Sequence, residues 1–560
     1  MDVYQKLAEK EEWARAGGRK DSPPRPVQRV PQRRVDRIPR LRPLNLPTKV
    51  SNMDVYQKLA EKEEWARAGG RNTERGVRIL ENRLFVRDRI RMLFDAEPDF
   101  EDGLLAGCEK GVPADAVITA IGSVSGRKVA VIANDFTSKA GTWGLQTFLK
   151  ITRFQELALQ LKIPLIYFVD SAGARIDEQK QCFLGRQAWG NIWFNQVKIS
   201  GAIPQICVLF GPSPAGAAYI PALCETVIMV DKQATAFLGS PRMVHMAIGE
   251  EISEEDLGGA RMHCAVSGLG DILVKSDAEA IAMTKNYLAF MPQSYLEKPA
   301  IVADTGKASP PDLREVIPVN EKLPFDMKIV IDALADDGSM LEHKALFAKE
   351  IVTSFIRLGG MPVGVVANNS KFKGGVLFND SSDKAARFVW LCNAFNIPLL
   401  FLQDISGYMI GSSAEKAGII RHGAKLLSAV CETTVPRITV LVRKAYGGGY
   451  LGMAGAPTQP DAMLALPTAM PALVGPETAI NAVHFNHIQA LPESERAAFV
   501  AKKREEYAKD IDVFSAAADP FAVEAVVHPN ELRRELIQRF RAYSLKKPAV
   551  YEKRNPIHPV

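Results

Sequence analysis

Four short loops that contain small residues are the parts of this 560-residue chain best suited to chemistry. They span 170–174, 213–218, 404–407 and 445–450, and each follows an apolar run and precedes a helical pattern. Small side chains let a ligand approach the backbone, and helix N-termini present unpaired N–H groups with partial positive charge. Two such turns together could direct amides at a developing enolate oxygen. The alternative is that these turns serve only tight packing.

The turns belong to two copies of one α/β unit. The first copy predicts a hairpin, a helix, a buried strand and a further strand, at 116–134, 145–162, 163–170 and 204–211. The second predicts a strand, a helix and two buried strands, at 361–369, 383–395, 397–404 and 436–444. A Pro-rich, charged stretch at 297–324 is the predicted linker. We therefore expect an α/β fold with mostly parallel sheets and right-handed crossovers.

The register of the repeat follows from identical residues at a constant spacing. Three residues recur 234 positions later, the pairs being Asn134 and Asn368, Pro164 and Pro398, and Asp170 and Asp404. Tyr219 recurs 231 positions later as Tyr450. Duplication of one ancestral unit explains this spacing better than chance.

Other common catalytic signatures do not occur in the sequence. There is no GxxxxGK[ST] loop, no dinucleotide-type GxGxxG after a first strand and no GxSxG elbow. No Ser-His-Asp arrangement stands out.

The net charge of +6 comes from the N-terminal segment. Residues 1–52 contain 13 Lys and Arg against 6 Asp and Glu, so the rest of the chain sums to about −1. We therefore expect no nucleic-acid partner, while a local basic patch for a phosphate-bearing ligand stays open. The sequence contains no apolar run of about 18 residues and no signal-peptide core, so we expect no membrane partner.

The cysteine and histidine patterns predict no metal in this chain. The seven cysteines form no CxxC pair and lie mostly in apolar runs, which indicates reduced thiols in a cytosol-like compartment. His484 and His487 are three positions apart, a spacing that is more often structural than metal-binding.

Residues 1–19 are repeated verbatim at 53–71, with a Pro/Arg-rich stretch between the two copies. Such a stretch cannot bury a core. We predict that 1–52 is a disordered basic segment, an upstream or expression-related extension; the alternative is a basic tail that binds a partner.

Seven long motifs make the chain recognisable. The sequence resembles the carboxyltransferase (β) subunits of biotin-dependent acyl-CoA carboxylases, including propionyl-CoA and methylcrotonoyl-CoA carboxylases and the related sodium-pumping decarboxylases. The resemblance extends from about residue 54 to 555. The motifs are VIANDFTSKAGTWG, VDSAGARIDEQ, GPSPAGAAYIPAL, GEEISEEDLGGA, AFNIPLLFLQDISGYMIG, GIIRHGAKLL and RKAYGGGY.

The resemblance implies two tandem crotonase-like (ClpP/crotonase) domains, the N-terminal carboxyltransferase domain at 53–305 and the C-terminal one at 306–555. It implies a homo-oligomer, usually a hexamer, in which the N half of one subunit faces the C half of another. Biotin would be carried on a partner biotin carboxylase/biotin carboxyl carrier (α) subunit, because this sequence has no biotinyl-lysine motif. The location implied is the cytoplasm, or the mitochondrial matrix if the source is eukaryotic.

The resemblance also implies roles for the turns. One oxyanion hole, for the acyl-CoA thioester, would use Ala215 and Gly216 with the Ala172–Gly173 loop. The other, for biotin, would use Gly448 and Gly449 with Gly407 nearby. Carboxybiotin would itself provide the base, so that no side-chain base is needed. The substrate pocket would include Tyr219, Tyr450 and Leu451, and either pocket or core roles stay open for Trp189 and Trp193.

The sequence does not select the acyl group. GIIRHGAKLL and RKAYGG are of the propionyl type, whereas AGAAYIPA and LFLQDISGYMIG are of the methylcrotonoyl type. Leu451 stands where propionyl-type enzymes carry an acidic residue. Two alternatives remain: a decarboxylase or transcarboxylase subunit that runs the same chemistry in reverse, and a non-catalytic assembly scaffold.

Overall fold

The computed structural model describes residues 52–81, 83–185, 188–518 and 522–547. The predicted disorder of 1–52 therefore lies outside the described residues, apart from Asn52, where helix α2 (Asn52–Ala68) begins. The described residues from 58 onward belong to one compact unit, which contains all three sheets, of seven, eight and two strands.

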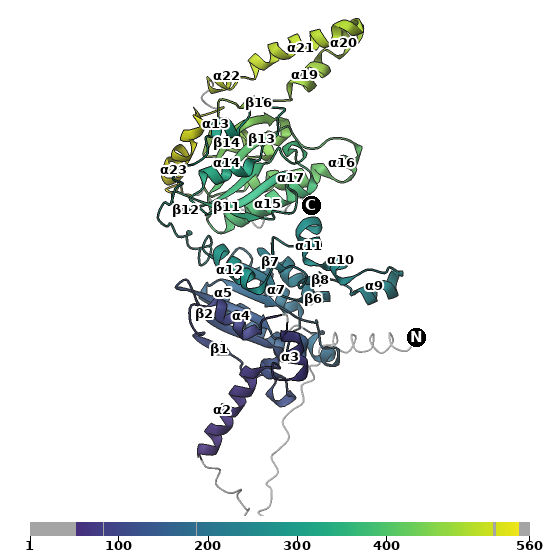
Figure 1. Cartoon of the computed structure of the whole chain (residues 1–560), viewed down its shortest axis with the longest axis vertical. Coiled ribbons are helices and arrows are strands. Elements are labelled where there is room, and N and C mark those ends of the chain that lie inside the picture. The colour runs from purple at the N-terminus through teal and green to yellow at the C-terminus, as the bar shows by residue number, and fades with distance from the viewer. Residues whose placement is uncertain (1–51, 82, 186–187, 519–521, 548–560) are drawn as a thin grey trace, which may run out of the picture. The chain divides into compact units, whose positions relative to one another are not determined.

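The first sheet has seven strands, and their order in the sheet is their order in the chain. The first two pairings are antiparallel and include the predicted hairpin, and all later pairings are parallel. The strands are β1 (Phe100–Asp102), β2 (Val117–Val124), β3 (Arg127–Asn134), β4 (Leu165–Val169), β5 (Gln205–Leu209), β7 (Thr226–Val230) and β9 (Ile272–Val274). Figure 1 labels β1, β2 and β7 of this sheet.

The second sheet repeats this plan. Its first two pairings are antiparallel and the others parallel, and one extra strand pairs with the end of β14. The prediction of an α/β repeat with mostly parallel sheets is confirmed. The strands are β10 (Leu341–His343), β11 (Ile351–Leu358), β12 (Met361–Asn368), β13 (Leu399–Ile405), β14 (Arg437–Tyr446), β15 (Ala462–Ala465), β16 (Met470–Ala472) and β17 (Ala525–Val526).

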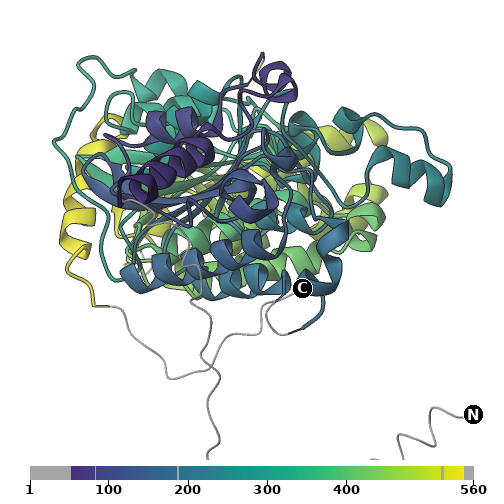
Figure 2. The ribbon, with the colours of Figure 1, turned by 90° about the horizontal axis from the view of Figure 1, so that it is seen from below.

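Helices lie on both sides of the strands (Figure 2). In the first copy α5 (Leu145–Leu161) and α7 (Gly190–Ile199) pack on one face of the sheet, and α4 (Val86–Leu93) and α12 (Asp277–Leu288) on the other. In the second copy α15 (Asn379–Ala394) and α17 (Ile419–Cys431) cover one face, and α14 (Met327–Leu334) and α23 (Leu532–Tyr543) the other.

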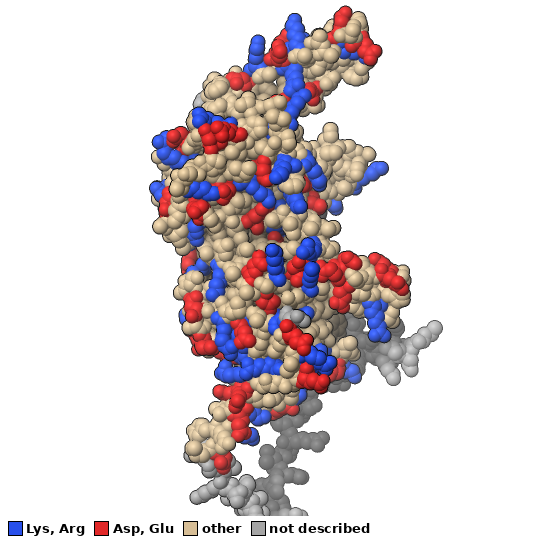
Figure 3. All heavy atoms as spheres, in the orientation of Figure 1, with Lys and Arg blue, Asp and Glu red and all other residues tan. Residues whose placement is uncertain are grey.

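The remaining helices connect or extend these layers. They are α3 (Glu74–Leu80), α6 (Gln179–Cys182), α8 (Tyr219–Ala222), α9 (Pro241–Ile248), α10 (Glu254–Gly258), α11 (Ala260–Met262), α13 (Leu313–Val316), α16 (Ser412–Lys416), α18 (Gly447–Gly452), α19 (Pro476–Val483), α20 (Phe485–Ala490), α21 (Glu493–Asp510) and α22 (Val513–Ala517). No helix of the described part of the chain is long and apolar enough to cross a bilayer. On the face shown in Figure 3, acidic and basic side chains are interspersed.

The second predicted helix begins earlier than expected, at Asn379. The reason is a hydroxyl cap: the Phe378 N–H donates to Ser381 Oγ at 2.7 Å. The same cap occurs at the equivalent place in the first copy, where the Gly144 N–H donates to Thr147 Oγ1 at 3.0 Å. The side chain of the third residue of a helix can accept a hydrogen bond from the backbone N–H of the residue just before the helix. The position of Ser381 was therefore a sequence signal for the earlier helix start.

The two copies share buried polar contacts as well as strand order. Lys150 Nζ donates to the carbonyls of Gly103, Ala114 and Val117. Its counterpart Lys384 donates to those of Phe347, Ala348 and Ile351. Burial lowers the pKa of Lys150 to about 8 and that of Lys384 to about 7. Each lysine side chain thus donates to three backbone carbonyls at the corresponding place in its copy.

A buried polar cluster links residues of the two copies. Lys344 Nζ lies 2.6 Å from Asp271 Oδ1, and the Lys344 N–H donates to the Asp271 carbonyl at 2.9 Å. His343 Nε2 lies 3.5 Å from the same carboxylate and 3.3 Å from Thr226 Oγ1. Burial lowers the pKa of His343 from 6.5 to about 4, against the opposing charge of Asp271. The imidazole is therefore neutral at pH 7.

The His343 side chain predicts an acid-sensitive fold. Below pH 6.5 the unfolded chain takes up a proton at this residue that the folded chain excludes until about pH 4. The free energy of unfolding should therefore fall as pH decreases through this window, by up to about 3 kcal/mol. Urea titrations at several pH values measure the slope. His343→Gln should flatten it, and an unchanged slope would assign the acid sensitivity to other groups.

Candidate functional site

The turns at 213–218 and 445–450 have the same backbone geometry. After β5, the short strand β6 (Pro212–Pro214) leads to Ala215, whose φ of +53° opens a 3₁₀ turn at Ala215–Ala218. After β14, Gly447 also has a φ of +53° and opens α18. In each turn the preceding residue is extended and the following one is glycine, Gly216 or Gly448.

This geometry changes which residues of the two copies correspond to each other at the turns. Ala215 corresponds to Gly447 and Gly216 to Gly448, so the offset between the copies here differs by one position from that taken from the two tyrosines. Strand β14 also continues to Tyr446, beyond its predicted end. Tyr219 and Tyr450 are therefore not structurally equivalent. Gly447, which the predicted turn 445–450 contains without a role of its own, begins α18.

Gly216 and Gly448 each have an amide without an intrahelical acceptor, because each is the second residue of its helical turn. Within the described residues, no other hydrogen bond from either amide occurs. Gly448 is exposed and Gly216 half-buried. Both amides are thus available to an incoming acceptor.

The Ala172 and Gly173 amides differ from the expectation that they serve an anion. The Ala172 N–H donates to the Ala140 carbonyl at 2.9 Å, and the Gly173 N–H to Ser171 Oγ at 3.1 Å. The loop closes on the turn that precedes α5, and this closure uses both donors. In this conformation the loop supports its neighbour rather than offering free amides.

Within each copy the two turns lie against each other. A Cβ built on Gly173 would lie 3.4 Å from Pro214 Cγ. In the second copy, a Cβ on Gly449 would lie 2.9 Å from Gly407 Cα and 2.8 Å from Ile405 Cδ1. Gly449 is buried, so its lack of a side chain is required for this close approach. The predicted pairing of turns is therefore present in the tertiary structure.

Aromatic side chains adjoin the turn at Gly216. A Cβ on Gly216 would lie 3.0 Å from the Trp193 ring, and this ring meets Tyr219 edge-on at 5.9 Å. Tyr219 is 47% exposed. Trp189 instead packs edge-on against Phe183. Of the two tryptophans left open by the sequence, Trp193 is the one beside the turn.

Tyr450 is half-buried. Its hydroxyl accepts a hydrogen bond from the Ala456 N–H at 2.8 Å, and its ring packs in a small core with Leu441 and Met463. Leu451 follows it within α18 and is half-buried. Tyr450 therefore packs against the core, whereas Tyr219, which is not its structural equivalent, lies at the surface.

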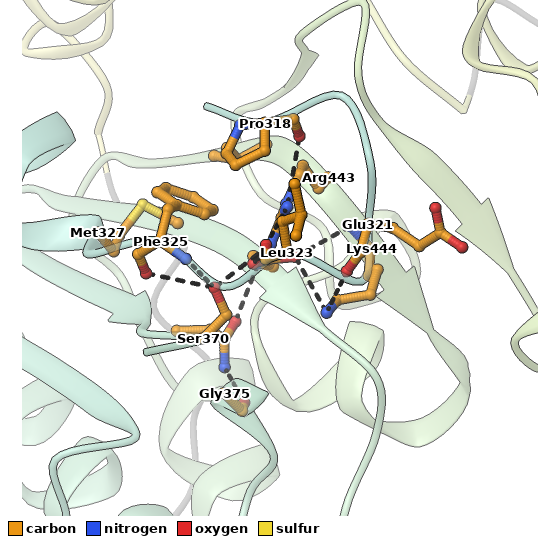
Figure 4. A network of polar contacts seen from close by, with 12 residues as sticks. Pro318, Glu321, Leu323, Phe325, Met327, Ser370, Gly375, Arg443 and Lys444 are labelled. Atoms are coloured by element: carbon orange, nitrogen blue, oxygen red, sulfur yellow. Dashed lines mark hydrogen bonds and ion pairs between the residues drawn. The ribbon is translucent and has the colours of Figure 1, made fainter. Parts of the chain in front are cut away.

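A buried ion pair joins β13 to β14, the strand that leads to the turn at Gly448. Figure 4 shows Arg443 among its partners Ser370, Pro318 and Leu323. Arg443 Nη2 lies 2.7 Å from Asp404 Oδ2, and both side chains are fully buried. Arg443 also donates to Ser370 Oγ and to three linker carbonyls, those of Pro318, Asn320 and Leu323. The predicted linker is thus bonded to the strand that ends in the turn at Gly448.

The equivalent carboxylate in the first copy, Asp170, has different partners. Arg83 and Arg89, from the segment before and within α4, lie 3.0 and 3.1 Å from its two oxygens. The Arg89 guanidinium also stacks over the Phe210 ring at 4.2 Å. Each copy therefore neutralises the same buried carboxylate with arginine from a different element. Within the described residues, no group of three His, Cys, Asp or Glu side chains is arranged to hold a metal ion.

Gly447, the first residue of α18, has a left-handed backbone conformation, which leads to a prediction about stability. Gly447→Ala should lower the free energy of unfolding by about 1–2 kcal/mol, because an L-residue at φ +53° is strained and its Cβ would lie 2.8 Å from the Leu473 carbonyl oxygen. Denaturant midpoints test this. The matched variant Ala215→Gly removes the same strain from the equivalent turn of the first copy and should not destabilise; equal losses in both variants would contradict the argument.

The comparisons with known proteins agree with this geometry. Residues 79–557 match the carboxyl transferase domain family. The protein named "Uncharacterized carboxylase YngE" from Bacillus subtilis is 51% identical over 514 residues, which cover 91% of this chain and 100% of that protein. The methylmalonyl-CoA carboxyltransferase 12S subunit of Propionibacterium freudenreichii is 37% identical over 500 residues, covering 88% and 94% of the two chains.

A solved structure of a transcarboxylase 12S hexamer, with methylmalonyl-coenzyme A and methylmalonic acid bound, superposes with a TM-score of 0.85 at 35% identity. The superposition covers 92% of this chain and 100% of that one. The crotonase-like fold expected for both halves is confirmed by this likeness. The duplicated sheets, the paired turns and the match across most of its length show that this chain belongs to the carboxyl transferase domain family.

Proposed function

We propose that this chain is the carboxyltransferase subunit of a biotin-dependent acyl-CoA carboxylase. It moves a carboxyl group from carboxybiotin to the α (or vinylogous) carbon of an acyl-CoA. The observation that carries the proposal is the matched pair of amides at Gly216 and Gly448, one in each copy of the fold. Transfer between a carboxybiotin and a thioester develops negative charge on two oxygens, and a preorganised amide is the usual way to stabilise each.

The two turns have different roles in the proposed reaction. The turn at Ala215 and Gly216 holds the thioester oxygen as the enolate forms, with Trp193 and Tyr219 beside the acyl group. The turn at Gly448 and Gly449, packed on Gly407, holds the ureido oxygen of biotin. Carboxybiotin, when bound, supplies the carboxyl group and the base for the α-proton. Ala172 and Gly173 support the turn at Gly216, and they could donate to the thioester oxygen only by giving up their present acceptors.

The proposed assembly follows from the same chemistry. Biotin arrives on a separate biotin carboxylase/biotin carboxyl carrier subunit. The solved relative is described as a hexamer, and we propose a homo-hexamer here, in which the Gly216 turn of one subunit faces the Gly448 turn of another. The proposed domains are 53–305 and 306–555. Binding both reactants between fixed turns also removes much of the entropic cost of a bimolecular step.

Purified chain, its biotinylated partner subunit, ATP and labelled bicarbonate test the proposal with a panel of acyl-CoAs. We expect label in the acyl-CoA only when all components are present. The likeness to a transcarboxylase subunit favours one second candidate, carboxyl transfer from a carboxylated acyl-CoA without ATP. Transfer that proceeds in the absence of ATP and bicarbonate supports that candidate, and no transfer under either condition contradicts both.

A further inference from the structure

The Tyr408 ring lies between α17 and α18, facing one glycine of the first helix and two of the second. A Cβ on Gly423 of α17 would lie 3.1 Å from Cε1, at one edge of the ring. At the opposite edge, a Cβ on Gly448 would lie 3.6 Å from Cδ2, and one on Gly452 would overlap the hydroxyl and lie 3.1 Å from Cζ. One ring therefore requires two helices to present glycine toward it.

The backbone around Tyr408 is held on both sides. The Leu377 N–H donates to the Gly407 carbonyl at 3.2 Å, and the Met409 N–H donates to the Leu377 carbonyl at 2.8 Å. Leu377 and Tyr408 form a parallel bridge just before α15. The ring therefore projects from a fixed segment, and it faces α18 at Gly448 and Gly452.

The first copy does not contain this arrangement. The residue at the equivalent bridge position is Ala174, which pairs with Trp143 as Tyr408 pairs with Leu377. There the ring beside the turn is Trp193, from α7, which approaches Gly216. The two turns thus receive their aromatic support from different elements, and a change at Tyr408 should affect the Gly448 turn alone.

We propose that Tyr408 is a positioning residue that holds the Gly448 amide at the place where the biotin oxygen binds. This inference rests on the proposed function of the Gly448 turn. Ring carbons lie nearest to Gly423 and Gly448, and the hydroxyl lies nearest to Gly452 without a hydrogen bond to any described residue, so we assign the role to the aromatic ring.

Steady-state carboxylation by the full chain with its biotinylated partner tests the role of the ring. Tyr408→Ala should lower kcat by about 100-fold, because loss of about 1 Å of positioning costs this much, while KM for acyl-CoA stays within about twofold. Tyr408→Phe keeps the ring and should keep kcat within about threefold. Loss of kcat in Tyr408→Phe would overturn the inference. So would an effect of Tyr408→Ala that appears in KM as strongly as in kcat.

A second variant separates positioning from a general loss of packing. Gly452→Ala leaves Tyr408 in the sequence but places a methyl group against its hydroxyl, so it should reproduce the loss of kcat. In the double variant Gly452→Ala/Tyr408→Ala the clash is absent, so the losses should not multiply. Multiplying losses would show that the two residues act independently and would overturn the inference.

Hydrogen exchange gives a readout independent of the reaction. The Met453 N–H donates to the Gly449 carbonyl at 3.0 Å, so its exchange reports opening of α18. Exchange at 450–454 should rise at least tenfold in Tyr408→Ala, and exchange at 215–219 should not change. Unchanged exchange at 450–454 would overturn the positioning role. Faster exchange with normal kcat would instead overturn the proposed function of the Gly448 turn.

Discussion

Gly448→Pro is expected to lower kcat for carboxyl transfer by about 10²–10³-fold, the usual effect of removing one oxyanion donor. Gly448 is the second residue of α18, where its N–H has no intrahelical acceptor. Proline is tolerated in the first turn of a helix, so the substitution removes the donor and preserves the hydrogen bonds of the helix. Steady-state kinetics with the biotinylated partner subunit measure the loss.

The matched control is Gly448→Ala. A Cβ at this position meets Tyr408 at 3.6 Å, an ordinary van der Waals distance, and alanine keeps the N–H. We expect kcat within a few-fold of the original chain and an unchanged oligomer in both variants. Similar kinetics for the proline and alanine variants would show that the Gly448 amide is not a donor in the reaction. Gly216→Pro applies the same test to the thioester side.

Arg443→Leu is expected to be the most destabilising single change considered, lowering the free energy of unfolding by about 3–5 kcal/mol. The substitution leaves Asp404 fully buried, with Lys444 Nζ at 3.7 Å as the remaining cation among the described ion pairs. It also releases the carbonyls of Pro318, Asn320 and Leu323, so the linker loses these three bonds to β14. Guanidinium titration followed by circular dichroism measures the change.

The double variant Arg443→Leu/Asp404→Leu tests whether the cost comes from the unpaired charge. Replacing both partners removes the buried carboxylate, so the double variant should recover a large part of the loss. If the double variant is no more stable than Arg443→Leu, the carbonyl contacts, and not the charge, account for the cost. Lower carboxylation in Arg443→Leu is also expected, because Asp404 begins the loop that packs on Gly449.

A large part of the fold could be predicted from the sequence because its signals are local. Apolar runs predicted β4, β5, β13 and β14, and the helical period predicted α5 and most of α15. The constant offset between identical residues predicted two copies of one sheet, and it also relates Lys150 to Lys384. Each of these signals lies within one element or in the identity of two residues at a fixed separation.

The candidate site could be predicted in part. Gly216, Gly448 and Gly449 stand in the motifs that carry the family resemblance, and the structure gives the first two free amides. The sequence could not indicate that the Ala172 N–H already donates to the Ala140 carbonyl, because α5 and β4 separate the two residues in the chain. Sequence identity also paired Tyr219 with Tyr450, whereas the backbone conformations pair Ala215 with Gly447.

By itself the sequence determined the repeat, the type of each main element and the family, since these depend on composition and period within short segments. Only the tertiary structure decided which amides are free, which arginines neutralise Asp170 and Asp404, and which aromatic ring supports each turn. Trp193 and Tyr408 lie on different elements, and nothing in their local sequence distinguishes them from core aromatics. Their contacts with Gly216 and Gly448 exist because the packing of helices against the sheets brings distant segments together, and no local pattern encodes that approach.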